Sequence, residues 1–178
     1  MNIETLKYPI GQPSIPENIS EKDIINWIAI LEEFPKSLEE LVKNLSEEQL
    51  NTTYKPNGWT IKQVIHHCYD SHHNSYNRFK WALTENTPTI KPYYEERWAA
   101  LKDSKEAPIS LSINALRTLH AKWVYLLNTL NFKELEKSFY HPTDKKEISL
   151  KESIAIYAWH CNHHFAHIKE LLKRKNWL

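Results

Sequence analysis

The sequence is poor in glycine and cysteine, and it has no long apolar run. Two glycines in 178 residues are too few for a glycine-rich phosphate loop, and no Gly-x-Ser-x-Gly motif is present. The two cysteines, Cys68 and Cys161, cannot form a disulfide framework, and we expect both to be buried thiols. No stretch approaches the roughly 18 apolar residues of a membrane helix, and the first residues show no signal-peptide pattern. We therefore expect a cytoplasmic protein without a membrane partner.

An excess of charge of either sign is also absent. The 23 lysines and arginines nearly balance the 22 acidic residues, the net charge is +1, and no run of like charges forms a stripe. This balance argues against nucleic acid as a partner. The length fits one domain over residues 1–178, large enough to bury a core without help from disulfides or metal.

Helical periodicity dominates the sequence. Apolar residues recur every three or four positions from Ile24 to Leu45, which predicts an amphipathic helix after an extended arm at residues 1–19. We expect Pro35 to kink or break this helix. Helix starts are indicated where Ser or Thr is followed three residues later by Asp, Gln or Glu, at Ser20/Asp23, Ser46/Gln49, Thr60/Gln63 and Ser149/Glu152.

A further helix is expected over residues 110–130, which makes four long helices in all. The long connection before it has room for one short helix, and the long connection after it has the pattern of a short hairpin at 140–148. The predicted fold class is therefore an all-α four-helix bundle with long connections.

The last predicted helix holds four of the ten histidines within residues 160–167. On a helical wheel, His160 and His164 lie at the edge of the apolar face. They are one turn apart, so both imidazoles can reach a single ion. The predicted helix within residues 59–83 places His67 in the same way, beside its own apolar face.

A polar line continues from His67 along the second long helix through Ser71, Asn74 and Arg78, and we expect it to wall a substrate cavity. Asp70, one turn from His67, is expected to orient the imidazole. The remaining histidines are given structural roles. We expect surface exposure for His66, His73 and His163, packing or supporting roles for His72 and His167, and a hydrogen-bonded boundary position for His120.

His67, His160 and His164 are thus predicted to form a three-nitrogen site for one divalent ion per chain, with adventitious capture by a histidine-rich patch as the alternative. Zinc is the expected ion, and nickel or another divalent ion is the alternative, because imidazole accepts several metals. No His-Glu-x-x-His occurs, and no histidine has a glutamate three residues before it. These absences exclude a zinc-protease helix and a di-iron carboxylate bundle.

Five segments together resemble the DinB-like (YfiT-type) superfamily of small metal-binding four-helix proteins. They are "YPIG" at 8–11, "GWTIKQVIHH" at 58–67, "DSHHNSY" at 70–76, "YHP" at 140–142 and "WHCNHHFAHI" at 159–168, which span nearly the whole chain. The resemblance implies an up-down-down-up bundle, often a homodimer, with a divalent ion on His67, His160 and His164. Many members carry Arg-Gly-Gln after the last ligand, where this chain has Phe-Ala-His at 165–167.

Three neutral histidines leave an ion its full charge and at least one open position, as in catalytic zinc sites. A water bound there has a pKa near ~7, and a bound thiol is deprotonated outright. From the resemblance, we expect S-transfer from bacillithiol or a similar small thiol to electrophiles in detoxification. From their place in the polar line, we expect Asn74 and Arg78 to hold the carboxylates or sugar of the thiol. A metal-dependent hydrolase is the enzymatic alternative, and a non-catalytic metal-binding module is the other.

Overall fold

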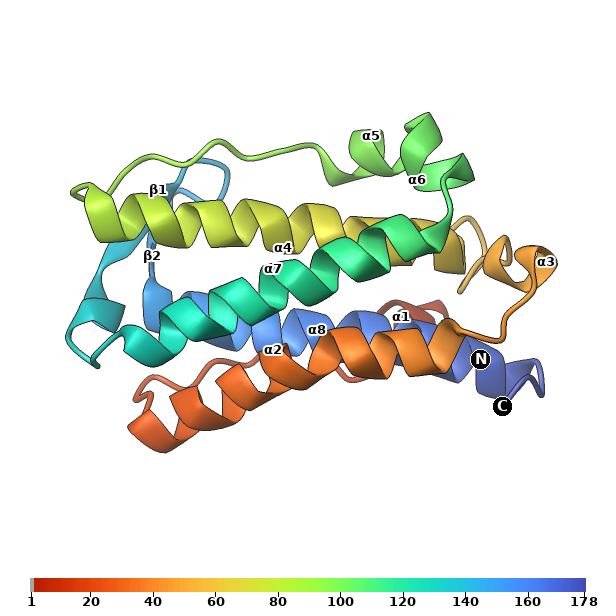
Figure 1. The fold of residues 1–178 in the computed structure, drawn as a ribbon, viewed down its shortest axis with the longest axis horizontal. Helices are drawn as coiled ribbons and strands as arrows, with labels where there is room; N and C mark the ends of the chain where they lie inside the picture. The colour runs from red at the N-terminus through yellow and green to blue at the C-terminus, as the bar shows by residue number, and fades with distance from the viewer. Residues whose placement is uncertain (1) are drawn as a thin grey trace.

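The computed structural model describes residues 2–178, and four long helices dominate it (Figure 1). These are α2 (Glu21–Val42), α4 (Ile61–Thr84), α7 (Ile109–Thr129) and α8 (Leu150–Arg174). Followed by colour in Figure 1, α2 and α8 run in one direction, and α4 and α7 run in the other. The chain is therefore a four-helix bundle with the expected up-down-down-up order.

Each long helix packs against two others. The strongly contacting pairs are α2 with α8, α2 with α7, α4 with α7, and α4 with α8. This closed ring leaves one core at its centre, filled by side chains that include the fully buried Leu31, Phe79, Trp123 and Ile154. The neighbouring positions of α4 and α8 allow side chains from both helices to share one site.

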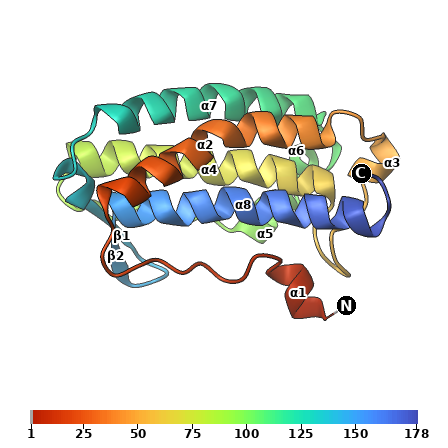
Figure 2. The ribbon, with the colours of Figure 1, turned by 90° about the horizontal axis from the view of Figure 1, so that it is seen from below.

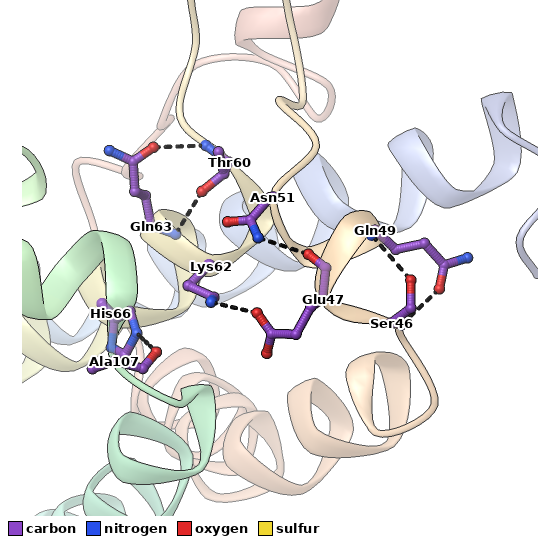
Figure 3. Close-up of polar contacts among 9 residues, drawn as sticks. All are labelled: Ser46, Glu47, Gln49, Asn51, Thr60, Lys62, Gln63, His66 and Ala107. Atoms are coloured by element: carbon purple, nitrogen blue, oxygen red, sulfur yellow. Dashed lines mark hydrogen bonds and ion pairs between the residues drawn. The ribbon is translucent and has the colours of Figure 1, made fainter.

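The helix starts follow the capping pattern of the sequence. All four predicted capping boxes are present, and Figure 3 shows those of Ser46 with Gln49 and Thr60 with Gln63. The short helix α3 (Glu47–Leu50) is also tied to the start of α4, because the Lys62 ammonium lies 2.7 Å from a carboxylate oxygen of Glu47. These contacts fix where α4 begins and hence the positions of the histidines that follow.

Helix α2 continues through Pro35 as one helix, so of the expected kink or break at this residue the break is wrong. A proline has no amide hydrogen, and the carbonyl of Leu31, four residues earlier, therefore lacks its usual helical partner. That carbonyl instead accepts a hydrogen bond from Nδ1 of His120 at 2.6 Å. A partner from α7 thus satisfies the backbone group that the proline leaves free.

The N-terminal arm is only partly extended. Ile3–Lys7 form the short helix α1, which corrects the expectation of a fully extended arm over residues 1–19. The segment after α1 runs beside α8 (Figure 2), where the indole N–H of Trp159 donates to the carbonyl of Gly11 at 3.2 Å. The arm therefore covers a face of α8 that the bundle itself leaves open.

The connections between the long helices carry the remaining elements. Two short helices, α5 (Glu95–Ala99) and α6 (Lys102–Glu106), lie where one was expected. A 3₁₀ turn (Glu134–Glu136) is followed by the expected hairpin, in which β1 (Ser138–His141) pairs antiparallel with β2 (Lys146–Ser149). None of the helices within residues 2–178 combines the length and apolar character needed to cross a membrane.

Candidate metal centre

His67 of α4 and His160 and His164 of α8 converge on one point. Each offers a ring nitrogen, and the three nitrogens lie within 4.8 Å of one another. The Nε2 atoms of His67 and His160 are 3.3 Å apart. Zinc–nitrogen bonds of about 2.0–2.1 Å in a tetrahedral site require nitrogens roughly 3.3–3.4 Å apart, so this spacing fits a shared ion.

Burial keeps the three imidazoles neutral. Removal from water lowers the pKa of His67 to about 4, and the same effect holds those of His160 and His164 well below the ordinary value of 6.5. The positive charge that each ring would carry also disfavours protonation of the others. At neutral pH the cluster therefore presents lone pairs, as a metal site requires.

Further histidines contact the outer nitrogens of the two α8 members. Nδ1 of His160 lies 2.9 Å from Nε2 of His72, and Nδ1 of His164 lies 3.4 Å from Nδ1 of His167. His72 and His167 are both buried, as their predicted packing and supporting roles require. With its Nδ1 in such a contact, each α8 histidine has Nε2 left for a metal ion, and Nε2 of His160 is the atom beside Nε2 of His67.

Trp59 was not identified from the sequence. It lies just before Thr60, the N-cap of α4, and its ring packs on that of His67 with centroids 4.6 Å apart. Its indole N–H donates to a carboxylate oxygen of Glu96 at 3.0 Å. The sequence did contain a signal for this contact, because Trp59 is a large aromatic residue at the helix start, about two turns before His67.

The expected role of Asp70 is wrong. Asp70 lines a surface hollow with His66, Asp103 and Ser112, on a side of α4 different from that of the cluster. Within residues 2–178, no hydrogen bond joins it to His67. Burial and the nearby Asp103 carboxylate raise the pKa of Asp70 to about 6. The ring of His67 is held by packing against Trp59 instead.

The polar line on α4 is present, and part of it is engaged inside the protein. The hydroxyl of Tyr157 donates to the backbone carbonyl of Ser71 at 3.2 Å, and the Ser71 hydroxyl lies 3.4 Å from the same tyrosine oxygen. The amide of Asn74 donates to the carbonyl of Asp70 at 2.8 Å. Arg78 is buried, with 9% of its surface exposed. The ring of Tyr157 lies 5.6 Å from that of His160, and its hydroxyl is hydrogen-bonded to Ser71 of α4.

Two of the three histidines expected at the surface are buried. His73 is exposed as predicted, but His66 and His163 are only 6% and 7% exposed. His66 is covered by the connection after α6, where it contacts the carbonyl of Ala107, and by the first turn of α7, where it contacts Ser112. His163 stacks on Trp159 beneath the N-terminal arm. His120, expected at a boundary, is fully enclosed and hydrogen-bonded.

The two cysteines take no part in the cluster. Both are completely buried free thiols, as expected. Burial raises the pKa of Cys68 and of Cys161 above the ordinary value, so neither side chain supplies a thiolate at neutral pH.

Comparison with known proteins gives consistent matches over nearly the full chain. Residues 30–168 match the model of the DinB superfamily. The protein named "Putative metal-dependent hydrolase YfiT" of Bacillus subtilis (strain 168) is 46% identical over 177 residues, 99% of each chain. A "Putative metal-dependent hydrolase" of Bacillus cereus (strain AH820) is 51% identical over 97% of this chain and 98% of its own. The solved structure of Bacillus subtilis YfiT, a four-helix bundle of unusual topology, superposes with a TM-score of 0.96 over 98% of this chain and 99% of the other.

Proposed function

The chain belongs to the DinB superfamily, and from this premise we propose that it is an enzyme whose divalent ion is held by His67, His160 and His164. The observation that carries the proposal is the convergence of three neutral imidazole nitrogens on one point, with two of them at a spacing that suits a metal. When bound, an ion with three neutral ligands keeps its full charge, and it supplies a Lewis acid with an open position for water or a thiol. Zinc is the ion we propose, with nickel as the alternative.

We propose S-transfer from a small thiol such as bacillithiol as the reaction. The cluster in residues 2–178 consists of histidines alone, without an aspartate or glutamate among its members. A thiol at a metal centre loses its proton without a dedicated base, whereas hydrolysis also needs a group that moves protons to the leaving atom. The donor set therefore supports the thiol reaction, as does the S-transfer that the DinB-like resemblance implies.

S-transfer needs no reagent other than the thiol and the electrophile. The thiol proton goes to solvent, the sulfur forms a bond to an electrophilic carbon, and the leaving group departs with its electron pair. The hydroxyls of Ser71 and Tyr157 orient the thiol, since the Tyr157 ring lies 5.6 Å from that of His160 and its hydroxyl contacts that of Ser71. The guanidinium of Arg78, further along the same face of α4, binds a carboxylate of the thiol.

Hydrolysis is the second candidate, and it is favoured by the names of the relatives. Glu96 is the group we assign to proton transfer in that case, because it bonds to Trp59, which packs on His67. The third possibility is a binding module in which the ion only ties α4 to α8. A His160→Ala protein separates this possibility from the enzymes, since a catalytic site loses turnover and keeps its fold, whereas a structural site loses thermal stability.

The experiment is a conjugation assay on protein of defined metal content. Bacillithiol is mixed with monobromobimane or chlorodinitrobenzene, and rates are compared for zinc-loaded protein, metal-free protein and His67→Ala. A rate that needs both the metal and His67 supports S-transfer. Absence of thiol conjugation in a protein that binds one ion per chain contradicts it. Turnover of ester or amide substrates that is lost in Glu96→Gln then identifies a hydrolase.

A further inference from the structure

We propose that two hydrogen-bonded histidine relays, each ending on a backbone carbonyl, fix the tautomers of His160 and His164 so that Nε2 of each points a lone pair at the ion. The residues of these relays are positioning residues that do not touch the metal. The inference rests on the proposed metal site, but it concerns proton positions that can be measured when no metal is bound.

The first relay crosses the core through all four long helices. It runs from His160 in α8 to His72 in α4, then to His120 in α7, and it ends at Leu31 in α2. The successive distances are 2.9 Å from Nδ1 of His160 to Nε2 of His72, 2.6 Å from Nδ1 of His72 to Nε2 of His120, and 2.6 Å from Nδ1 of His120 to the carbonyl oxygen of Leu31. Each of its two inner histidines thus uses both ring nitrogens.

The carbonyl at the end of this relay sets the direction of every bond in it. A carbonyl oxygen can only accept, so Nδ1 of His120 carries the proton and its Nε2 is an acceptor. His72 must then donate from Nδ1, which leaves its Nε2 to accept from Nδ1–H of His160. Nε2 of His160 is consequently unprotonated, and it is the atom 3.3 Å from Nε2 of His67.

The two inner histidines of the first relay, His72 and His120, each hold one proton because their surroundings disfavour a second. His72 is 0% exposed and His120 is 1% exposed, and apolar or aromatic rings, including those of Phe34 and Trp123, surround both. Within residues 2–178, the hydrogen bonds of both side chains are those of the relay itself. A second proton on either ring would place a charge in this apolar core.

The terminal carbonyl is free because of Pro35. In an uninterrupted helix, the amide of residue 35 would donate to the carbonyl of Leu31, and proline has no amide hydrogen. The oxygen of Leu31 can therefore receive His120 as its hydrogen-bond donor. Pro35 therefore influences the histidine cluster through the relay, without contacting the cluster itself.

In the second relay a backbone carbonyl again fixes the direction of the bonds, and a single histidine, His167, lies between the cluster and that carbonyl. Nε2 of His167 lies 3.0 Å from the carbonyl oxygen of Lys7, and its Nδ1 lies 3.4 Å from Nδ1 of His164. Lys7 is the last residue of α1, where helix carbonyls have no partner within the helix. His167 must donate to this carbonyl from Nε2 and accept from Nδ1–H of His164, so Nε2 of His164 is also unprotonated.

The test combines tautomer measurement with metal affinity. Nitrogen NMR spectra of metal-free protein labelled with ¹⁵N-histidine, with signals assigned by their loss in His160→Gln and His164→Gln, are expected to show Nδ1–H and unprotonated Nε2 for both residues. In His120→Leu, His72 is free to donate from Nε2, which moves the proton of His160 onto the atom that must bind the ion. We expect zinc affinity to fall about 10- to 100-fold, the range for lost outer partners of metal ligands.

Two matched variants separate this effect from a general loss of packing. His120→Gln retains a donor for the Leu31 carbonyl and an acceptor for His72, so affinity is expected to stay within about threefold of the parent. Trp123→Phe disturbs the packing around both relay histidines and removes no bond of the relay, since the indole N–H has no hydrogen-bond partner in residues 2–178. Its zinc affinity is also expected to be unchanged.

The relay inference and the proposed function fail in different ways. Nε2–H on His160 or His164 in the metal-free parent overturns the relay, even if the enzyme is active and binds zinc. Equal zinc affinity in His120→Leu and the parent overturns it as well. A parent protein that has the expected tautomers and binds no ion contradicts the proposed function and leaves the relay standing. If His120→Leu does not fold, the spectrum of the parent still decides the question.

Discussion

The indole ring of Trp59 lies against the imidazole of His67, with ring centroids 4.6 Å apart and planes inclined by 51°. Trp59 is therefore the tryptophan we expect to report on the metal site, because an open-shell ion such as nickel quenches a nearby excited indole. Nickel should lower the intrinsic fluorescence of the parent, and Trp59→Phe should lose most of that change. Trp81→Phe, which alters a tryptophan on the outer face of α4, is the control and should keep it.

Replacing one cluster histidine should abolish tight metal binding. In His67→Ala, two imidazoles remain, and we expect zinc affinity to fall at least ~100-fold while the helical circular dichroism is retained. Titration calorimetry on metal-free protein measures the effect. His73→Ala changes an exposed histidine on the same helix and should bind one ion per chain like the parent. An equal loss of zinc affinity in His67→Ala and His73→Ala would indicate that surface histidines capture the metal.

Metal should stabilise the fold as a ligand of the native state. At a free zinc concentration 1,000 times the dissociation constant, binding adds about 4 kcal/mol to the free energy of unfolding. The melting temperature should therefore rise with zinc in the parent and stay constant in His160→Ala. Thermal melts at several zinc concentrations provide the measurement. If the melting temperature of the parent did not change with zinc concentration, a metal site shared between α4 and α8 would be contradicted.

Metal-free protein should lose stability on mild acidification. Burial lowers the pKa of His120 to about 4, whereas the unfolded chain titrates near its ordinary value of 6.5. Between these values the unfolded state binds more protons, so the free energy of unfolding falls as the pH drops from 6.5 toward 4. His120 alone accounts for about 3 kcal/mol across this window. Urea unfolding at pH 7.5 and 4.5 should show a smaller difference for His120→Gln than for the parent.

Arg78→Gln should weaken thiol binding and leave the metal in place. A buried guanidinium that pairs with a substrate carboxylate contributes a charge-assisted bond, and its loss is expected to raise KM for bacillithiol about tenfold or more. Zinc affinity and the dependence of rate on the electrophile should be unchanged. A loss of kcat at saturating thiol, with KM unaltered, would argue against a binding role for this residue.

Much of the bundle could be predicted from local sequence patterns. Capping boxes such as Ser149 with Glu152 placed the helix starts correctly, because the bonds that form them join residues only three apart. The wheel also placed His67, His160 and His164 on inward edges of their helices, since the apolar residues of each helix define its core direction. Both features are determined by residues within a single helix, so they can be predicted without knowing how the helices pack.

The errors concern contacts between segments that are far apart in the sequence. His163 and His66 were expected at the surface because a wheel shows only the direction of a side chain. The N-terminal arm covers His163, and the connection near Ala107 covers His66. Asp70 was assigned to His67 from its spacing of one turn, but the two side chains point to different sides of α4. The break at Pro35 was expected from the missing amide alone, without a histidine on another helix to satisfy the carbonyl.

The path from Leu31 to His160 has a consequence for the order of folding. Its four members come from α2, α7, α4 and α8, so it is complete only when all four long helices have docked. An intermediate in which α4 and α8 had paired alone would hold His67, His160 and His164 near one another without a fixed proton on His160. High-affinity zinc capture would then mark the last stage of assembly, and refolding followed in the presence of zinc should show uptake that lags behind helix formation.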